Sequence, residues 1–211
     1  MKNKKRYFKA DIFGKNGRNL WLILFFIILG ISIGAFTEKM MSLSQKSELG
    51  IFLDRYFNIA YLDNLSKKEI LTQSVVNNYK MLGIIFLSSV LVIGFPIIFA
   101  VLTYKGITIG FTVAFFMEKM QMRGLGIAIS SILPQNIVFI PVLIIAALIG
   151  LGFSFEILFR KDGPHRRGYF QVLSGYSIMF ILLCFILFIG CLIETYIGSI
   201  LMKKIIEMSL K

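Results

Sequence analysis

The sequence predicts an all-α membrane protein, a polytopic bundle of about five transmembrane helices with a helical extracytoplasmic segment. Hydrophobic residues make up 57 % of the 211 residues. Several apolar runs approach the ~20 residues that an α-helix needs to cross a bilayer. The formal net charge is +12, and the basic residues cluster beside these runs, where they set topology and attract anionic lipid. Nucleic acid is therefore not an expected partner, and one membrane domain over residues 1–211 is predicted.

The chain begins with a basic flank, residues 1–19, in which Asp11 is the single acid. Such a flank belongs on the cytoplasmic side. The first predicted span is 20–36, with Trp21 at its entry as an interfacial anchor. The run exceeds the usual apolar region of a signal peptide and no A-x-A site follows, so we interpret it as a retained span with the N-terminus inside.

Residues 37–80 form the predicted extracytoplasmic segment. Apolar side chains recur there at the spacing of an amphipathic helix, and a capping box at Ser66 and Glu69 predicts a second helix that runs into the next span. The segment is interpreted either as a helical hairpin on the membrane surface or as a docking surface for a partner, and the two are compatible. The docking candidates are Phe52, Tyr56 and Phe57.

The second predicted span is 81–104, with a kink at Pro96 and Lys105 as its cytoplasmic stop. The third is 106–122, which has a short apolar core. A straight helix over the next run, 124–159, would be about 54 Å long, well beyond the ~30 Å bilayer core. This fourth span must therefore bend, or its first half must fold back against the third segment as a re-entrant hairpin.

The expected bend lies at Pro134, because proline removes a backbone donor and clashes with the preceding turn. Gln135 and Asn136 lie beside it, and Pro141 follows. Unpaired amides are costly at this depth. The sequence leaves two interpretations open: a kinked span whose amides bond to neighbouring helices, or a functional polar pocket.

The basic loop 160–169 sets the remaining topology. Its arginines and lysine belong in the cytoplasm, which requires the third span to cross outward and the fourth inward. The fifth predicted span is 170–193. The tail, 194–211, would then lie outside, although it is basic; a sixth partial crossing or a tail on the membrane surface stays open.

The sequence offers no hydrolytic or redox motif. The G-x-S-x-G match at residues 30–34 lies in a predicted membrane helix, whereas that motif needs a strand–turn–helix context. The same stretch gives the pair Gly30 and Gly34, and Gly106 and Gly110 repeat that spacing, which lets membrane helices pack closely. No zinc, thiol-redox or P-loop motif is present. We therefore expect no catalytic residues, no metal and no cofactor.

The short run 106–115, followed by Leu133-Pro134-Gln135-Asn136 and Pro141, resembles the stage II sporulation protein M family. The resemblance extends over nearly the whole chain. It implies a multi-pass protein of the bacterial cytoplasmic membrane that acts in engulfment of the forespore at the septum. It also implies two peptidoglycan-hydrolase partners, sporulation proteins D and P.

The functional hypothesis is a non-enzymatic scaffold that recruits and positions these wall hydrolases. The alternative is a permease or lipid-handling protein with its polar site at Pro134, Gln135 and Asn136. Membrane lipids are expected partners in either case, and homo-oligomerisation stays open.

Overall fold

The computed structural model describes residues 17–62, 67–91, 94–158 and 166–198. Parts of the predicted basic flank, the Ser66 cap, the basic loop and the tail lie outside these residues. The described chain is helical and contains no strand, so the all-α prediction is confirmed. Its elements are α2 (Gly17–Met40), α3 (Leu43–Leu62), α4 (Lys67–Val90), α5 (Phe95–Leu158), α6 (Arg166–Ile193) and a π-helical turn η1 (Glu194–Gly198).

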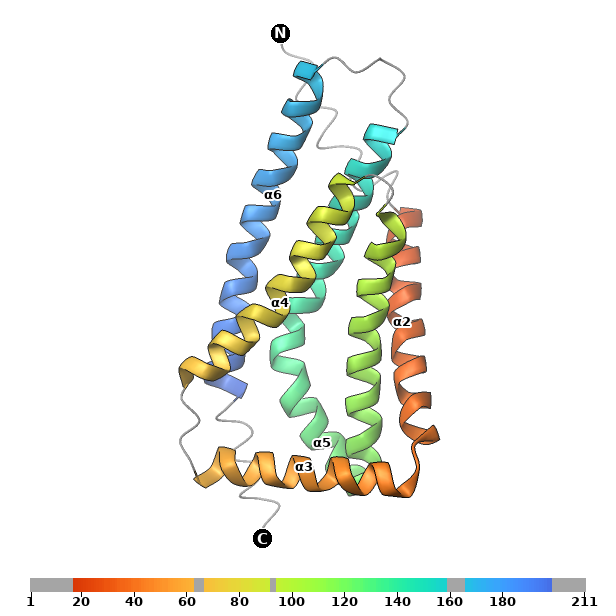
Figure 1. Cartoon of the computed structure of the whole chain (residues 1–211), viewed down its shortest axis with the longest axis vertical. Coiled ribbons are helices and arrows are strands. Elements are labelled where there is room, and N and C mark those ends of the chain that lie inside the picture. The colour runs from red at the N-terminus through yellow and green to blue at the C-terminus, as the bar shows by residue number, and fades with distance from the viewer. Residues whose placement is uncertain (1–16, 63–66, 92–93, 159–165, 199–211) are drawn as a thin grey trace.

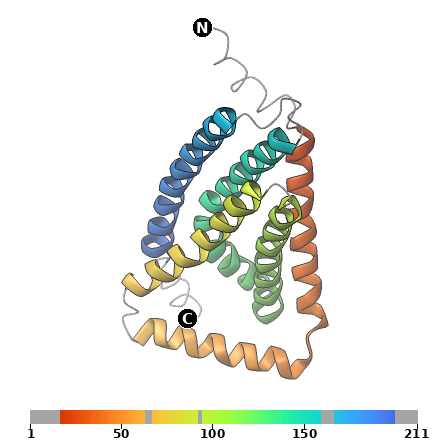
Figure 2. The same ribbon diagram turned by 45° about the horizontal axis from the view of Figure 1, so that its top comes forward.

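Four of the helices form an elongated bundle and the fifth lies across its end. Figures 1 and 2 show α2, α4, α5 and α6 running lengthwise and α3 crossing beneath them. The start of α2, the end of α5 and the start of α6 lie at the opposite end of the bundle from α3 (Figure 1). The chain segments 1–16 and 159–165 adjoin these three helix ends.

α5 folds back on itself and forms two antiparallel arms. The Lys105 ammonium lies 5.6 Å from the centre of the Phe139 ring, although a straight helix would separate these residues by about 51 Å. A Cβ added at Gly150 would lie 3.5 Å from the Ile98 side chain. Figure 1 shows the reversal at the α3 end of the bundle.

The predicted bend at Pro134 falls within residues 119–135, where α5 reverses direction, but the helix is not broken there. Helical structure continues through Pro134, and the chain reverses direction between the two apolar arms, Phe95–Glu118 and Asn136–Phe155. The arms cross in opposite directions, as the third and fourth predicted spans were expected to do. A helix can bend gradually while keeping most of its hydrogen bonds, so a proline need not end it.

The junction between α4 and α5 corrects the second predicted span. The helices separate at residues 91–94, inside the predicted span 81–104. The Gly94 carbonyl accepts hydrogen bonds from the amides of Ile97 (2.9 Å) and Ile98 (3.2 Å), and so begins α5. Pro96 falls in this first turn, where a missing amide proton costs nothing. Lys105 is consequently in the middle of an apolar arm and is not a stop at its end.

Four helical segments of the described chain are long and apolar enough to cross a membrane: Gly17–Met40, Phe95–Glu118, Asn136–Phe155 and Leu173–Tyr196. The sequence analysis expected about five spans. The difference is α4, whose first half is too polar to qualify by composition. The fifth predicted span, 170–193, corresponds to the last of the four segments, within a helix that begins at Arg166.

α4 nevertheless lies beside α6 through the depth of the bundle, in the antiparallel direction. The Tyr79 hydroxyl donates a hydrogen bond to the Cys184 carbonyl at 2.8 Å. Further along α4, the Phe86 ring stacks on Tyr176, with 5.2 Å between ring centres. Because α6 contains an apolar membrane segment, α4 lies at membrane depth as well.

The core lies between α4, both arms of α5 and α6, and Ile23 of α2 packs against it. Phe153 stacks on Tyr176 at 4.3 Å, and Phe180 packs against the same tyrosine at 4.7 Å. Since lipid tails are as apolar as leucine, such contacts stabilise the bundle through close packing. Other fully buried core side chains are Ile23, Leu82, Ile85, Ile98, Leu102, Leu151 and Leu187.

Candidate functional site

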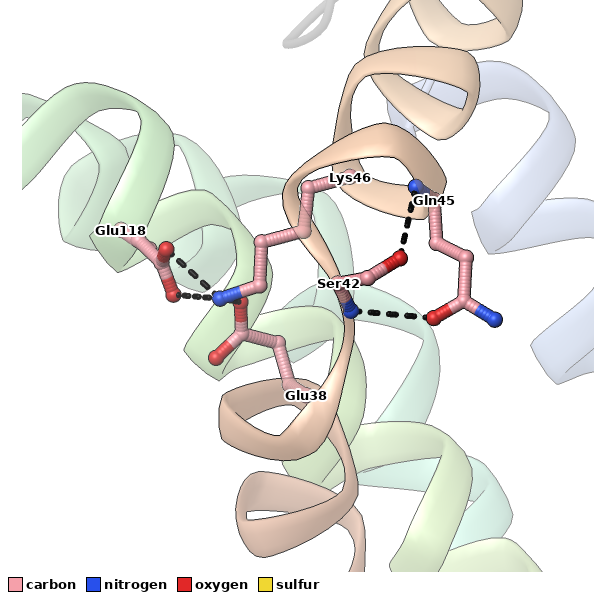
Figure 3. A network of polar contacts seen from close by, with 5 residues as sticks. All are labelled: Glu38, Ser42, Gln45, Lys46 and Glu118. Atoms are coloured by element: carbon pink, nitrogen blue, oxygen red, sulfur yellow. Dashed lines mark hydrogen bonds and ion pairs between the residues drawn. The ribbon is translucent and has the colours of Figure 1, made fainter.

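A capping box starts α3 and fixes the angle at which the chain leaves α2. The Gln45 amide donates to the Ser42 hydroxyl at 3.3 Å, and the Ser42 amide donates to the Gln45 side-chain carbonyl at 3.0 Å (Figure 3). The pair satisfies two backbone donors that a helix start would otherwise leave unbonded. The sequence S-x-x-Q at residues 42–45 carries this signal, but the sequence analysis did not use it.

One lysine joins α3 to the ends of α2 and of the first arm of α5. The Lys46 ammonium lies 2.6 Å from both carboxylate oxygens of Glu118 and 3.1 Å from Glu38 (Figure 3). The hydrogen bond to Glu118 is the main reason why the pKa of Lys46 is raised above 10.5. Lys46 therefore stays protonated at physiological pH and bridges two carboxylates from different helices. Glu38, only 2 % exposed, depends on this cation because a buried charge without a partner is costly.

Beyond the contacts of Lys46 with Glu38 and Glu118, which we call the Lys46 clamp, α3 extends over the end of the bundle and exposes apolar side chains. Ile51 is 61 % exposed and Phe52 is 64 % exposed. The other two docking candidates, Tyr56 and Phe57, lie on the same helix, but their side chains are outside the described part of the structure. The hairpin interpretation of 37–80 is corrected in one respect: α3 lies across the end, whereas α4 enters the bundle (Figure 1).

The two glycine pairs lie opposite each other in the contact between α2 and the first arm of α5. A Cβ added at Gly106 would lie 3.0 Å from the Cα of Gly30. A Cβ at Gly34 or Gly110 would overlap a backbone carbonyl of the facing helix, that of Ile107 or Ile31 respectively. Residue numbers increase together along both helices, so the helices are parallel. Their backbones are in direct contact at these four positions.

Ionisable and polar side chains meet inside the bundle at the level of η1. The Ser74 hydroxyl of α4 donates a hydrogen bond to the Glu194 carboxylate. Lys105, on the first arm of α5, is close enough for its charge to attract that of Glu194, but the two side chains do not form an ion pair. We call Ser74, Lys105 and Glu194 the intramembrane polar cluster. Charged residues in membrane helices mark functional sites or interior ion pairs.

The sequence analysis did not find this cluster. It placed Lys105 at a membrane face, as the cytoplasmic stop of the second predicted span. Lys105 lies well inside the segment Phe95–Glu118, a position that sequence alone could indicate only if the helix start at residue 95 were known. Glu194 lies on a π-helical turn, a local geometry that is frequent at functional sites.

The predicted polar site at Pro134 is described only in part. Asn136 is 6 % exposed and Pro141 is exposed, while the side chains of Pro134 and Gln135 are outside the described part. Asn136 is one helical turn from Phe139, which contacts Lys105. The buried amide therefore faces the same side of the return arm as the ring that meets the intramembrane polar cluster.

The serine of the G-x-S-x-G match has an ordinary helical role. The Ser32 hydroxyl donates to the Ile28 carbonyl one turn back, at 3.0 Å, on an exposed face of α2. Cys184 and Cys191 are both free thiols. Within the described ranges, no three His, Cys, Asp or Glu side chains are grouped so that they could hold a metal ion.

Comparison with known proteins gives one match. Residues 22–199 match the family described as Stage II sporulation protein M. The searches of curated proteins and of solved structures found no match. The family match includes α2 to η1 and both glycine pairs, the features that build the bundle. The chain therefore belongs to the stage II sporulation protein M family and is a sporulation-related membrane protein.

Proposed function

We propose that this protein is a non-enzymatic scaffold that recruits and positions peptidoglycan hydrolases at the sporulation septum. One observation carries the proposal: α3 is fixed across the end of the membrane bundle by Lys46, with apolar side chains exposed beyond the clamp. A helix held in this way is a preformed surface, so a partner that binds it loses little entropy in ordering it.

The proposed orientation has the N-terminus in the cytoplasm and α3 outside, facing the cell wall. The start of α2, the end of α5 and the start of α6 share one end of the bundle (Figure 1). The two basic stretches of the sequence adjoin that end, and basic segments stay in the cytoplasm. α3 is at the other end, which is where wall enzymes act.

The proposed partners are sporulation proteins D and P, as family membership suggests. Phe52 has the properties of an interface anchor, because a large exposed aromatic ring buries much area on binding. The proposal includes Tyr56 and Phe57, which follow about one turn later on α3. The hydrolases would supply the chemistry, and the scaffold would supply their position.

The test is co-purification of the two hydrolases with the tagged protein from sporulating cells. We expect Phe52→Ala/Tyr56→Ala/Phe57→Ala to lower their recovery at least tenfold, since aromatic anchors each contribute about 2 kcal/mol or more. Lys46→Met should give a smaller loss, because α3 keeps its surface but loses its fixed position. Insertion of all variants is checked by membrane extraction.

Phe185→Ala is the matched control, since Phe185 of α6 is 67 % exposed on a membrane helix. It should recover both hydrolases in full. Equal recovery of the hydrolases with the triple variant and with the parent protein would rule out α3 as the docking surface. Recovery of neither hydrolase from the parent, with the protein stably inserted, would reject the scaffold function.

A second candidate function is a permease or lipid-handling protein. The intramembrane polar cluster favours it, because interior charges are typical of substrate and ion pathways. Gln135→Leu/Asn136→Leu separates the two functions. A permease should lose transport while it still recruits partners, whereas a scaffold should change only through its folding.

A further inference from the structure

The outward face of α4 is polar over its first half. Figures 1 and 2 both show α4 in front of the return arm of α5, so one side of α4 is covered by the bundle. The opposite side carries a shallow hollow of about 600 Å³. We call it the α4 polar face; its residues, all exposed, are Lys68, Glu69, Thr72, Gln73, Val76, Asn77 and Lys80.

This face extends from one membrane interface to the middle of the bilayer. At one end, the Lys67 ammonium lies 5.3 Å from the ring of Tyr196, the last residue of the apolar segment Leu173–Tyr196. Tyr79 bonds to the carbonyl of Cys184, midway along that segment. Lys80 follows Tyr79 and points outward. The protein alone would thus expose an ammonium group near the bilayer centre, where it is costly.

Beyond Lys80 the same side of α4 becomes apolar. Ile84, Leu87 and Leu91 follow at helical spacing and are exposed. The outward face of α4 is therefore polar over its first half and apolar over its second half. The polar part lies at the depth of the acyl chains of the leaflet on the α3 side. A phospholipid in that leaflet would place its chains against the polar side chains, so lipid does not match this face.

A second copy of the chain also matches poorly. In a two-fold dimer whose axis is perpendicular to the membrane, each residue meets its own copy near the axis. Lys80 would then face the partner's ammonium group near the bilayer centre. An acid on the neighbouring helix would instead neutralise Lys80, and amide or hydroxyl side chains would bond to Thr72, Gln73 and Asn77.

We propose that the α4 polar face binds a transmembrane helix of another protein, one that carries an acidic residue near its midpoint opposite Lys80. This surface is separate from α3, and it would let the protein select partners by their membrane anchors as well as by their outer domains. The inference goes beyond the proposed function and does not depend on it, because either surface can bind while the other does not.

A synthetic helix of leucine and alanine tests the proposal directly. Peptides with Glu, Lys or Leu at the central position are labelled and reconstituted with the labelled full-length protein in phosphatidylcholine vesicles. Energy transfer reports their association. Polar contacts between membrane helices predict that the Glu peptide binds about 3- to 15-fold more tightly than the Leu peptide. The Lys peptide should bind no better than the Leu peptide.

Charge exchange at residue 80 gives the decisive comparison. Lys80→Leu should abolish the preference for the Glu peptide, and Lys80→Glu should transfer it to the Lys peptide. Neither change should impair insertion or packing, because the side chain is exposed. Lys39→Leu is the control, since Lys39 is also exposed but lies near the end of α2; it should leave the preference intact.

Three results would overturn the proposal. The first is equal association of the three peptides with the parent protein. The second is a self-cross-link from a photoreactive residue placed at Asn77, which would show that a second copy covers the face. The third is a preference for the Glu peptide that persists in Lys80→Leu. This result would show that the peptide binds another part of the chain and that the α4 polar face is not its binding site.

Discussion

Single charged residues decide how the helices of this protein meet. Lys46 contacts Glu38 and Glu118 at the end of the bundle, where its head can still reach water. Lys105 and Glu194 instead attract each other in the interior, where the effective dielectric constant is low. Removing one member of such an interior pair leaves the other charge without its partner, whereas removing both leaves an apolar contact.

The interior pair predicts a non-additive double-mutant cycle. Lys105→Met and Glu194→Leu should each lower the free energy of unfolding, with a coupling energy between the two changes of about 0.5–3 kcal/mol. The double variant should recover most of that loss, because no uncompensated charge remains. Thermal unfolding in detergent gives the free energy of unfolding of the parent protein, the two single variants and the double variant. Additive losses in the double variant would show that the two residues act independently.

Among the elements, α2 and the first arm of α5 have the closest contact. Four glycines bring two backbones together along parallel helices, and added Cβ atoms at Gly34 and Gly110 would overlap carbonyl groups. The overlap is with backbone atoms, which cannot rotate away as a side chain can. The helices would therefore have to separate to accept any larger residue.

Gly110→Ala should accordingly lower the unfolding temperature in detergent and loosen the contact between α2 and α5. We expect a loss of about 1–3 kcal/mol, the usual range for overpacking. Gly83→Ala and Gly152→Ala are matched controls, since an added Cβ at either helical position meets nothing within 4 Å. Both controls should match or slightly exceed the parent in stability, because alanine favours a helix. A loss of the same size in the controls would contradict close packing as the cause.

At the scale of the whole molecule, α5 packs against α2, α4 and α6 and contributes both of its arms to one core. Its first arm pairs with α2, and its return arm lies with α4 and α6 in the aromatic core. The hairpin places the start of α2, the end of α5 and the start of α6 at one end, and α3 at the other (Figure 1). Two basic stretches far apart in sequence thereby adjoin the same end of the bundle.

This arrangement predicts the membrane topology. A reporter inserted between α5 and α6 should have the same location as one fused before α2, in the cytoplasm, because basic segments resist translocation. A reporter inserted between α3 and α4 should be extracytoplasmic. Alkaline phosphatase and fluorescent-protein fusions distinguish the two sides. Opposite locations for the first two reporters would contradict the hairpin arrangement of α5.

The sequence determined the helical class, the membrane environment and the family. Each depends on local quantities: the length of apolar runs, the basic residues beside them and the motifs at Gly106–Gly110 and Pro134–Asn136. The capping box at Ser42 and Gln45 was also readable, since it needs only residues three apart. Local spacing is sufficient for such features because the partners lie on one helical turn.

The tertiary structure alone decided which residues meet. Residues 81–104 and 95–118 are both apolar enough to predict a membrane helix, and hydrophobicity does not fix where a helix begins within a continuous apolar stretch. The contact of Lys105 with Phe139 and the depth of Lys80 follow from how α5 folds back and how α4 lies on α6. These placements depend on packing between distant helices, which is a property of the whole bundle and not of any segment of it.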